Sequence, residues 1–393
     1  MEPSKAYWID NEGLMSKLKF AIVVTTIGKG DFLDIYCQQA SIEGLRHHLR
    51  IIVIPDQKSP TELYEKCNSL VSAGFDVACP SLSEQESYLT RFGSLVDLSP
   101  YNSDNRRNIG FLMALEWGCD VLISLDDDNY CIQIQGNNVF DNYAVVCRDQ
   151  VKLPAVYSSN NWFNICDMLE VEPNSRVYPR GFPYHKRHQQ AEVTFAEESG
   201  PVRLNAGLWL GEPDLDAITW LAAPVRAKSF NGQSVFLGQN TWSPINTQNT
   251  SLHRDLIVAF YFVRMGYPLA GMPIDRYGDI FSGYFCQACV RHLGHRIRVG
   301  TPIALHKRNS HNYLRDLTNE LGCIWVLEDL TEWLCEIKLE GNTYAEAYLS
   351  LADALNHQVE RFKGFIWTDA TRAYFHQMSY CMRQWVAAFR QIG

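Results

Sequence analysis

Three short apolar stretches in the first third of the chain each end at small polar or acidic residues. Residues 19–26 read KFAIVVTT, residues 50–55 read RIIVIP and stop at Asp56, and residues 120–125 read DVLISL and stop at three aspartates. Short β-branched runs of this kind are typical of strands that are buried on both faces. The sequence therefore predicts three parallel strands whose carboxyl ends carry polar and acidic side chains.

Helical spacing alternates with these strands. Ile109, Leu112 and Trp117 lie on one helical face immediately before the third strand. Strands that alternate with helices predict an α/β fold with a mainly parallel sheet, in which ligands bind beyond the carboxyl ends of the strands. Residues 158–249 are rich in Asn, Pro, Gly and Trp, and we expect them to form irregular walls around a site, with few regular elements.

The pattern changes after residue 310. A capping box, Thr343 with Glu346, precedes an apolar stripe at helical spacing, and a second stripe follows near the C-terminus. We expect an α/β body over residues 1–310 and a helical extension over residues 311–393 that packs on it. The same stripes fit a subunit interface, which leaves a homo-oligomer open.

Composition narrows the class of protein. The 393 residues carry a formal net charge of −9 and are 46% hydrophobic, which excludes disorder for most of the chain and gives no overall positive field for nucleic acid. The sequence shows no secretion signal and no membrane span, so we expect a cytoplasmic protein. Cys286 and Cys289 have no second pair at zinc spacing, which favours a packing role.

Several common cofactor and catalytic motifs are absent from the sequence. Gly28 and Gly30 follow the first strand, but Leu33 stands where a dinucleotide-binding turn needs its third glycine. No G-x-S-x-G, P-loop or H-E-x-x-H motif occurs. We therefore expect neither a flavin nor a nicotinamide enzyme.

Asp126, Asp127 and Asp128 leave a buried strand together. Three adjacent carboxylates repel one another, and a divalent cation relieves that repulsion. If the strand continues, Asp126 and Asp128 face the same side and can hold Mg²⁺ or Mn²⁺ against the diphosphate of a nucleotide sugar. The alternative is an acidic surface turn completed by Asn129.

His306 follows an apolar stretch and precedes a cluster of cations that begins with Lys307 and Arg308. An imidazole suits Mn²⁺, and the cations suit phosphate oxygens, although a lone histidine is usually structural. Arg106 and Arg107 precede the helix before the third strand and either favour an anion there or form a solvated basic face.

Asp279 lies at the edge of an apolar and aromatic segment, DRYGDIFSGYF. This setting can raise the pKa of a carboxyl group or allow it to stabilise a developing cation. The competing interpretation is a helix N-cap.

Taken in order, these motifs resemble those of the plant reversibly glycosylated polypeptides, the UDP-arabinopyranose mutases. The resemblance runs from about residue 20 to about residue 355. Its residues are Thr26, Asp56, Arg107 with Gly110, Asp126–Asp128, Arg180-Gly181-Phe182-Pro183, Gly207-Leu208-Trp209-Leu210, Pro213-Asp214-x-Asp216-Ala217, Asn249, Arg254-Asp255, Arg276-Tyr277-x-Asp279, Gly283, and Gly300-x-Pro302 ahead of His306.

The resemblance implies a GT-A-like fold and a flavin-independent enzyme that interconverts the pyranose and furanose forms of a nucleotide sugar with Mn²⁺ or Mg²⁺. The chain is also similar to bacterial GDP-sugar mutases of antibiotic pathways, so we expect GDP ahead of UDP. Pro173 stands where plant members carry the arginine that takes up sugar, which argues against self-glycosylation and assigns Arg180 to the diphosphate or to charge stabilisation.

The resemblance also suggests a role for each candidate residue. The implied metal ligands are Asp128, His306 and Asp126. The implied nucleotide-binding residues are Thr26, Asp56, Arg107, Asp126 and Lys307. The implied sugar-binding residues are Trp209, Asn249 and Asp279, and the implied catalytic residues are Asp279, Arg180 and Asp127.

Two other functions remain open at this point. A GT-A glycosyltransferase would pass the sugar to a separate acceptor with the same metal and nucleotide residues. A non-catalytic subunit would bind the nucleotide sugar or a catalytic homologue, although the intact acidic triplet, His306 and Asp279 argue against a degenerate site.

Overall fold

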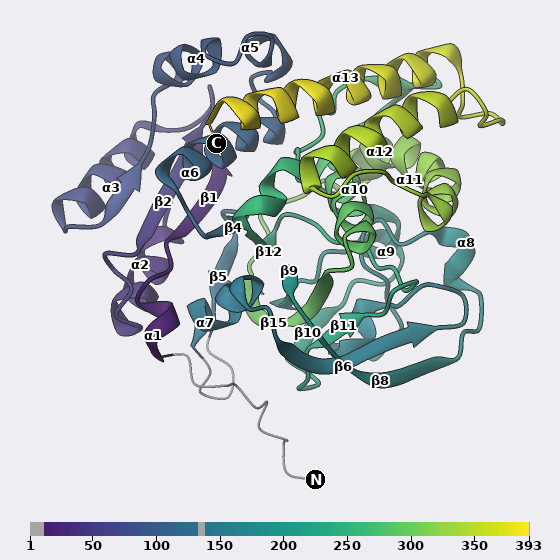
Figure 1. Cartoon of the computed structure of the whole chain (residues 1–393), viewed down its shortest axis with the longest axis horizontal. Helices are drawn as coiled ribbons and strands as arrows, with labels where there is room; N and C mark the ends of the chain where they lie inside the picture. Colours follow the sequence, from purple (N-terminus) through teal and green to yellow (C-terminus); the bar gives the residue numbers. More distant parts are fainter. Residues whose placement is uncertain (1–11, 133–137, 393) are drawn as a thin grey trace.

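The computed structural model describes residues 12–132 and 138–392 (Figure 1). The N-terminal stretch 1–11, part of the segment in which we looked for a secretion signal, lies outside this range. The first part of the chain contains α1 (Glu12–Met15), β1 (Phe20–Thr26), α2 (Leu33–Ile42), β2 (Leu49–Pro55), α3 (Thr61–Ser72), β3 (Asp76–Ala78), α4 (Leu82–Thr90), α5 (Leu95–Leu98), the 3-10 helix η1 (Asp104–Arg106), α6 (Arg107–Trp117) and β4 (Val121–Leu125). The three expected strands are confirmed as β1, β2 and β4.

These strands are buried on both faces, as their unbroken apolar runs predict. β1 pairs in parallel with β2 and with β4, and β2 pairs in parallel with β3. Along β1, Ala21 and Val23 pack in the same apolar cluster as residues of α6, whereas Ile22 and Val24 pack in the cluster that contains residues of α2 and α3. Because neighbours on a strand point to opposite faces, an apolar residue is needed at every position.

The second part of the chain extends this sheet with mixed strand directions. Its elements are β5 (Asn129–Cys131), α7 (Val139–Tyr143), η2 (Ala144–Cys147), β6 (Val151–Ser158), η3 (Ile165–Met168), β7 (Leu169–Glu172), α8 (Tyr184–Arg187), β8 (Val193–Gly200), β9 (Val202–Gly211), α9 (Ala217–Ala222), β10 (Arg226–Phe230), β11 (Val235–Leu237), β12 (Asn249–His253), η4 (Arg254–Ala259), β13 (Pro268–Leu269), β14 (Met272–Pro273), α10 (Gly278–His292) and β15 (Arg296–His306). The main path of the described sheet runs β3-β2-β1-β4-β12-β9-β15-β11-β6-β8. The expected α/β class is confirmed, with the parallel strands β1 to β4 flanked by helices.

The expectation of few regular elements over residues 158–249 is wrong. β7 to β11, α8 and α9 all fall there, and β9 alone spans ten residues. Two features hide these strands in the sequence. β8 lies at the end of the main sheet path with mostly exposed side chains, and the contacting stretches of β9 and β12 bury polar side chains such as Asn205 and Ser251, which hydrogen-bond to each other at 3.0 Å. Neither pattern gives the apolar alternation from which strands are recognised.

The C-terminal helices are α11 (Tyr313–Glu336), α12 (Tyr344–Gln358) and α13 (Asp369–Ile392), and the capping box at Thr343 and Glu346 is confirmed. They lie together on one side of the molecule, where α13 reaches across toward α6 (Figure 1). Trp385 of α13 is fully buried and donates to the carbonyl of Ile257 at 3.3 Å. The helices therefore pack on the body, while the boundary at residue 310 stays a prediction.

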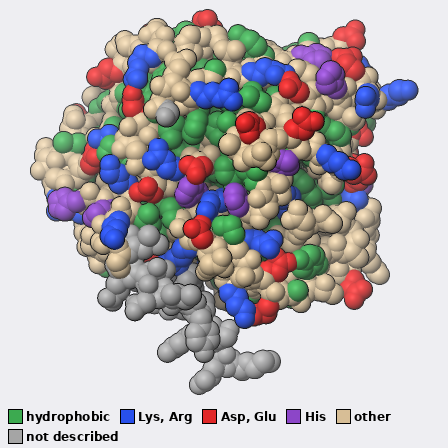
Figure 2. Space-filling model, viewed as in Figure 1, with side chains coloured by type: hydrophobic (Ala, Val, Ile, Leu, Met, Phe, Trp, Pro, Cys, Tyr) green, Lys and Arg blue, Asp and Glu red, His purple; other side chains and the backbone are tan. Residues whose placement is uncertain are grey.

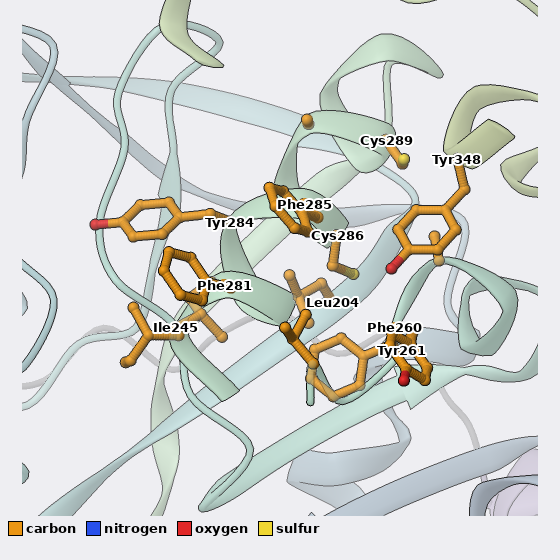
Figure 3. Close-up of a cluster of buried hydrophobic side chains, with 14 of the residues drawn as sticks. Leu204, Ile245, Phe260, Tyr261, Phe281, Tyr284, Phe285, Cys286, Cys289 and Tyr348 are labelled. Atoms are coloured by element: carbon orange, nitrogen blue, oxygen red, sulfur yellow. The ribbon is translucent and has the colours of Figure 1, made fainter. Parts of the chain in front are cut away.

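α10 passes through the centre of this packing. Phe281, Phe285, Cys286 and Cys289 are buried on it and meet side chains from the sheet and from α12 (Figure 3). The packing role expected for the two cysteines is confirmed. Among the described residues, no helix has the length and apolar character to cross a bilayer.

One glycine sets how closely α6 approaches the sheet. A Cβ atom on Gly110 would lie 2.4 Å from a side-chain carbon of Val23 and 3.2 Å from one of Ile54. We predict that Gly110→Ala lowers the free energy of unfolding by about 1–3 kcal/mol, because the added methyl group forces the helix away from a fully packed sheet. Urea denaturation measures the change. Gly13→Ala is the control, since a Cβ there has no neighbour within 4 Å; equal unfolding midpoints for the two variants would contradict the prediction.

Candidate functional site

A cavity of about 420 Å³ opens beyond the carboxyl ends of β1, β2 and β4. Segments far apart in the chain meet at this cavity. Acidic, basic and histidine side chains are interspersed over the face of the molecule shown in Figure 2. The candidate residues that line this cavity are Thr26, Asp56, Arg107, Asp126, Asp127, Asp128, Arg180, Asp279 and His306. Residues brought together from seven separate stretches of sequence thus share one polar cavity.

The three aspartates form a turn after β4 and not a continuation of the strand. The strand alternation that would point Asp126 and Asp128 to one side therefore does not apply. Instead each carboxylate has its own partner: Asp126 accepts from Arg107 at 2.7 Å, Asp127 accepts from Thr26 at 2.5 Å, and Asp128 lies 3.2 Å from the His306 ring.

Burial and neighbouring charges shift the pKa values of the three aspartates in this turn in different directions. Burial raises the pKa of Asp127 to about 6, and the adjacent carboxylates of Asp126 and Asp128 add to the rise. Burial also raises the pKa of Asp126 despite the Arg107 charge. Asp128 behaves in the opposite way, because hydrogen bonding to His306 and the charge of that residue outweigh burial and lower its pKa.

His306 is held by hydrogen bonds to both ring nitrogens. Its Nδ1 donates to the backbone carbonyl of Glu212, and this bond leaves Nε2 facing Asp128 and the side-chain amide of Gln248, the latter at 3.0 Å. Burial alone would lower the pKa of His306, but hydrogen bonding to Asp128 and its charge raise it. A histidine fixed through Nδ1 presents Nε2 as a metal donor. Among the described residues, however, no group of three or more His, Cys, Asp and Glu side chains is arranged to hold a metal ion.

Arg106 and Arg107 are both buried, so a solvated basic face is excluded. Arg106 donates to the Gln85 side chain and to the carbonyl of Ser99, inside the protein. Arg107 donates to Asp126, Ser124 and Thr247, and thereby fixes the acidic turn against the sheet. Both guanidinium groups are thus engaged by protein atoms.

Arg180 lies between two buried carboxylates. Its Nε and Nη2 donate to Asp214 at 2.9 and 3.0 Å, and its Nη1 and Nη2 donate to Asp279 at 3.0 and 2.7 Å. The remaining Nη1 hydrogen bonds to the carbonyl of Arg276. Because a guanidinium has five N–H donors, none is left for a diphosphate. The expectation that Arg180 contacts the diphosphate is therefore corrected: in this geometry it orients Asp279.

Asp279 is the second residue of α10, whose N-cap is Tyr277, so the N-cap interpretation of Asp279 is wrong. Asp214, on the other side of Arg180, also accepts from the Asn246 amide at 2.6 Å. Burial alone would raise the pKa of Asp214, but the charge of Arg180 and its hydrogen bonds lower it.

Three predicted contact residues lie outside the cavity lining. Asn249 is fully buried, and its amide donates to the carbonyls of Leu208 and Pro302 at 3.3 and 3.0 Å. Trp209 is buried on β9, and the Lys307 ammonium lies 4.6 Å from the centre of the Tyr130 ring. The burial of Trp209 and Asn249 corrects their sugar-binding roles. Lys307 is exposed between the lining residues His306 and Arg308, and its nucleotide-binding role stays a prediction.

Sequence reasoning missed or passed over several residues of the cavity wall. Arg308, Arg276, His311 and Asp104 line it, and Arg276 adopts a left-handed backbone with φ of 66°. Arg308 was noted only as one of a group of cations. Its side chain is 5% exposed, and its Nη1 has no hydrogen-bond partner among the described residues.

The helix α11 supports this wall through two acidic side chains. Glu320 is fully buried, and it accepts from Arg276 at 3.0 Å and from the backbone N–H of Ala217 at 2.8 Å. Asp316 accepts from His311 at 2.9 Å. Two acidic side chains of the extension thus hold residues of the cavity in place.

Comparison with known proteins agrees with the resemblance found in the motifs. The family model described as "Reversibly glycosylated polypeptide" matches residues 16–393. The chain is 22% identical over 376 residues to the probable UDP-arabinopyranose mutase 4 of Arabidopsis thaliana, which covers 95% of this chain and 90% of that protein. It is 27% identical over 220 residues to UDP-arabinopyranose mutase 1 of Oryza sativa subsp. japonica, covering 55% of this chain and 54% of the rice protein.

Solved structures show a more distant likeness. Glucosyl-3-phosphoglycerate synthase from Mycobacterium tuberculosis, in complex with Mn²⁺, uridine diphosphate and phosphoglyceric acid, aligns with a TM-score of 0.39 at 14% identity over 83% of this chain and 81% of its own. Mannosyl-3-phosphoglycerate synthase from Rubrobacter xylanophilus aligns with a TM-score of 0.35 at 12% identity over 83% of this chain and 77% of its own.

The Arg180 arrangement predicts a large loss of stability when its charge is removed. Arg180→Met leaves Asp214 and Asp279 buried without their cation, and removing one partner of such a buried pair costs about 3–5 kcal/mol. Without Arg180, burial raises the pKa of Asp214 above its unfolded value, so protonation favours the folded variant. The deficit relative to the wild type therefore shrinks as the pH falls from 8 to 5.

Urea denaturation at both pH values measures this deficit. The control is Arg176→Met, which breaks an exposed pair with Asp167 whose side chains are 63% and 42% exposed. This control should show little change at either pH. A deficit for Arg180→Met that is small, or that grows as the pH falls, would contradict the arrangement.

Proposed function

The chain belongs to the reversibly glycosylated polypeptide family, and from this premise we propose that it is a nucleotide-sugar mutase that interconverts the pyranose and furanose forms of its substrate. The observation that carries the proposal is the single cavity in which the acidic turn, His306 and the Arg180-bound Asp279 meet. Relatives named as UDP-arabinopyranose mutases support this activity. Their names favour a UDP-linked sugar, and similarity to bacterial GDP-sugar mutases keeps GDP as the other nucleotide to test.

The nucleoside end of the substrate is assigned to the part of the cavity near β1 and β2. Thr26 and Asp56 lie at the ends of these strands, and Lys58 lines the same wall. Arg308 also lines the cavity, and its Nη1, which has no hydrogen-bond partner among the described residues, can donate to a phosphate oxygen. Arg107 acts indirectly in this proposal, because its donors already hold Asp126 and the neighbouring strand.

The donor set near the acidic turn fits a divalent metal ion. Asp128 and the Nε2 atom of His306 lie 3.2 Å apart, and a carboxylate with an imidazole suits Mn²⁺ or Mg²⁺. In the proposal these two residues hold the ion, with Asp126 assisting. When bound, such an ion neutralises charge on the diphosphate as the glycosidic bond breaks.

The reaction begins with cleavage of the bond between C1 and the diphosphate oxygen, which keeps the electron pair. The sugar is left as an oxocarbenium-like cation, and Asp279 is assigned to stabilise its charge. Arg180 fixes the direction of this carboxylate through two hydrogen bonds, so little reorganisation is needed as charge develops. A different hydroxyl of the sugar then bonds to C1, the old ring oxygen leaves C1, and the diphosphate returns to C1, so that the ring size changes.

Water must be kept from the cation, or the nucleotide sugar would be hydrolysed. Ile54 and Phe262 contribute apolar surface to the cavity wall.

One observation supports a glycosyltransferase as the second candidate function. A polar cleft of about 460 Å³ adjoins the first cavity and shares Arg276, Ser310 and His311 with it. This cleft offers room for a separate acceptor. A transferase of this kind would cleave the same bond but give no change of ring size without the acceptor.

The proposed function predicts ring exchange without an acceptor. Purified protein incubated with UDP- and GDP-sugars and Mn²⁺ should convert the pyranose form to the furanose form, and excess chelator should stop the conversion. Chromatography of the products gives the ring size and the preferred nucleotide together. Binding or slow hydrolysis with every nucleotide sugar, and no change of ring size, would favour the transferase.

The assigned metal ligands predict a loss of metal affinity. Asp128→Asn and His306→Ala should each weaken Mn²⁺ binding at least tenfold in isothermal titration calorimetry with nucleoside diphosphate present, because each removes one of two adjacent donors. His311→Ala is the control, since His311 lines the same cavity but pairs with Asp316. Unchanged affinity in both ligand variants would reject the assignment.

A further inference from the structure

We propose that Asp104 carries the proton of the ring exchange, accepting it from the hydroxyl that closes the new ring and returning it to the oxygen that leaves the old one. This inference rests on the proposed mutase activity and adds a catalytic residue that the motifs did not indicate. Asp104 begins the 3-10 helix η1, immediately before α6, and lines the cavity from the wall formed by this segment.

The first argument is that Asp104 is the cavity carboxylate with no hydrogen-bonding partner among the described residues. Arg180 binds Asp279 and Asp214, Arg107 binds Asp126, and Thr26 binds Asp127. The remaining cavity carboxylates, Asp128 and Asp56, are bonded to the Asn129 amide and to backbone N–H groups respectively. A carboxylate tied to a cation or a hydroxyl is a poor proton acceptor, whereas the side chain of Asp104 is exposed to the cavity and free to receive one.

The second argument is the position of Asp104 relative to the proposed reaction centre. Asp104 interacts electrostatically with Arg107 of α6, with Asp126 after β4, and with Asp275 and Asp279 at the start of α10. Asp104 and Asp279, the carboxylate assigned to the sugar cation, both line the same cavity. A substrate held there would lie between Asp279, which is held by Arg180, and Asp104, which has no such partner among the described residues.

The chemistry of Asp104 suits this exchange near neutral pH. Although solvent reaches the side chain, the surrounding protein desolvates it and raises the pKa of Asp104 to about 6; the charge of Arg107 opposes this rise, and the charges of Asp126, Asp275 and Asp279 add to it. A group with this pKa is mostly ionised at pH 7, and its conjugate acid is strong enough to return the proton.

The proposed step balances without a co-reactant. After C1 has lost the diphosphate, the ring-closing hydroxyl oxygen forms a bond to C1 and its proton passes to Asp104. The bond from C1 to the old ring oxygen then breaks, and that oxygen keeps the electron pair and takes the proton from Asp104. A diphosphate oxygen finally bonds to C1. No proton or electron is gained or lost overall, as an isomerisation requires.

The test separates bond cleavage from ring exchange. With a nucleotide sugar labelled with ¹⁸O at the bridging oxygen, scrambling of the label into non-bridging positions reports cleavage and return of the C1–O bond, while chromatography reports ring size. We expect Asp104→Asn to keep isotope scrambling within about threefold of the wild type and to slow ring exchange by about 10²–10⁴-fold. Asp104→Glu should recover part of the ring exchange, because it restores a carboxylate.

The pH profile gives a second readout. In the wild type, ring exchange should decline as the pH falls below about 6, because protonated Asp104 cannot accept a proton. The residual activity of Asp104→Asn should lack this decline. Asp97→Asn, which removes an exposed carboxylate on α5 outside the cavity lining, is the matched control and should leave both activities and the profile unchanged.

Three outcomes would overturn the inference in distinguishable ways. Equal loss of isotope scrambling and ring exchange in Asp104→Asn would place the residue in binding or in bond cleavage. Unchanged ring exchange in Asp104→Asn would make it a bystander. Isotope scrambling by the wild type with no ring exchange for any UDP- or GDP-sugar would reject the mutase itself, and with it the role of Asp104.

Discussion

The buried group formed by Arg180, Asp214 and Asp279 is the constraint on which the site depends. Arg180 lies in the loop before α8. Its partners are Asp214, 34 residues further along the chain after β9, and Asp279, 99 residues further along at the start of α10. Two carboxylates and one guanidinium carry a net negative charge away from bulk water, and such a group is tolerated only when all its hydrogen bonds are made. The group therefore sets the position of Asp279 more strictly than apolar packing alone could do.

The same balance of charge appears throughout the cavity. Arg107 is paired with Asp126, Asp128 lies beside His306, and Arg276 is held by Glu320. Most of the cations suggested by the sequence are thus engaged inside the protein, and the groups that remain open to a substrate are few. Arg308 and Asp104 are among them, one able to donate to an anion and the other able to take up a proton.

The sequence predicted those strands and helices whose pattern depends on residues that are close together in the chain. The runs that became β1, β2 and β4 were recognisable because both faces are buried, and α12 was recognisable from its capping box. The strands within residues 158–249 were missed because their polar side chains are satisfied only by partners distant in sequence. Asn249 was misassigned for a related reason: a Cβ on Gly207 would lie 2.3 Å from its amide nitrogen, so this pair of motif residues reflects close packing between strands. The partners of Arg180 and the isolation of Asp104 are properties of the assembled cavity and leave no periodic signal.

Because Glu320 and Asp316 belong to α11, the cavity wall can be completed only late in the synthesis of the chain. The sheet strands β1 to β4, which carry the acidic turn, leave the ribosome first and can pack early, since domains begin to fold during synthesis. Arg276 and His311 obtain their partners only after the first turns of α11 have emerged. A nascent chain that ends before this helix would carry the sheet strands with an unfinished cavity wall.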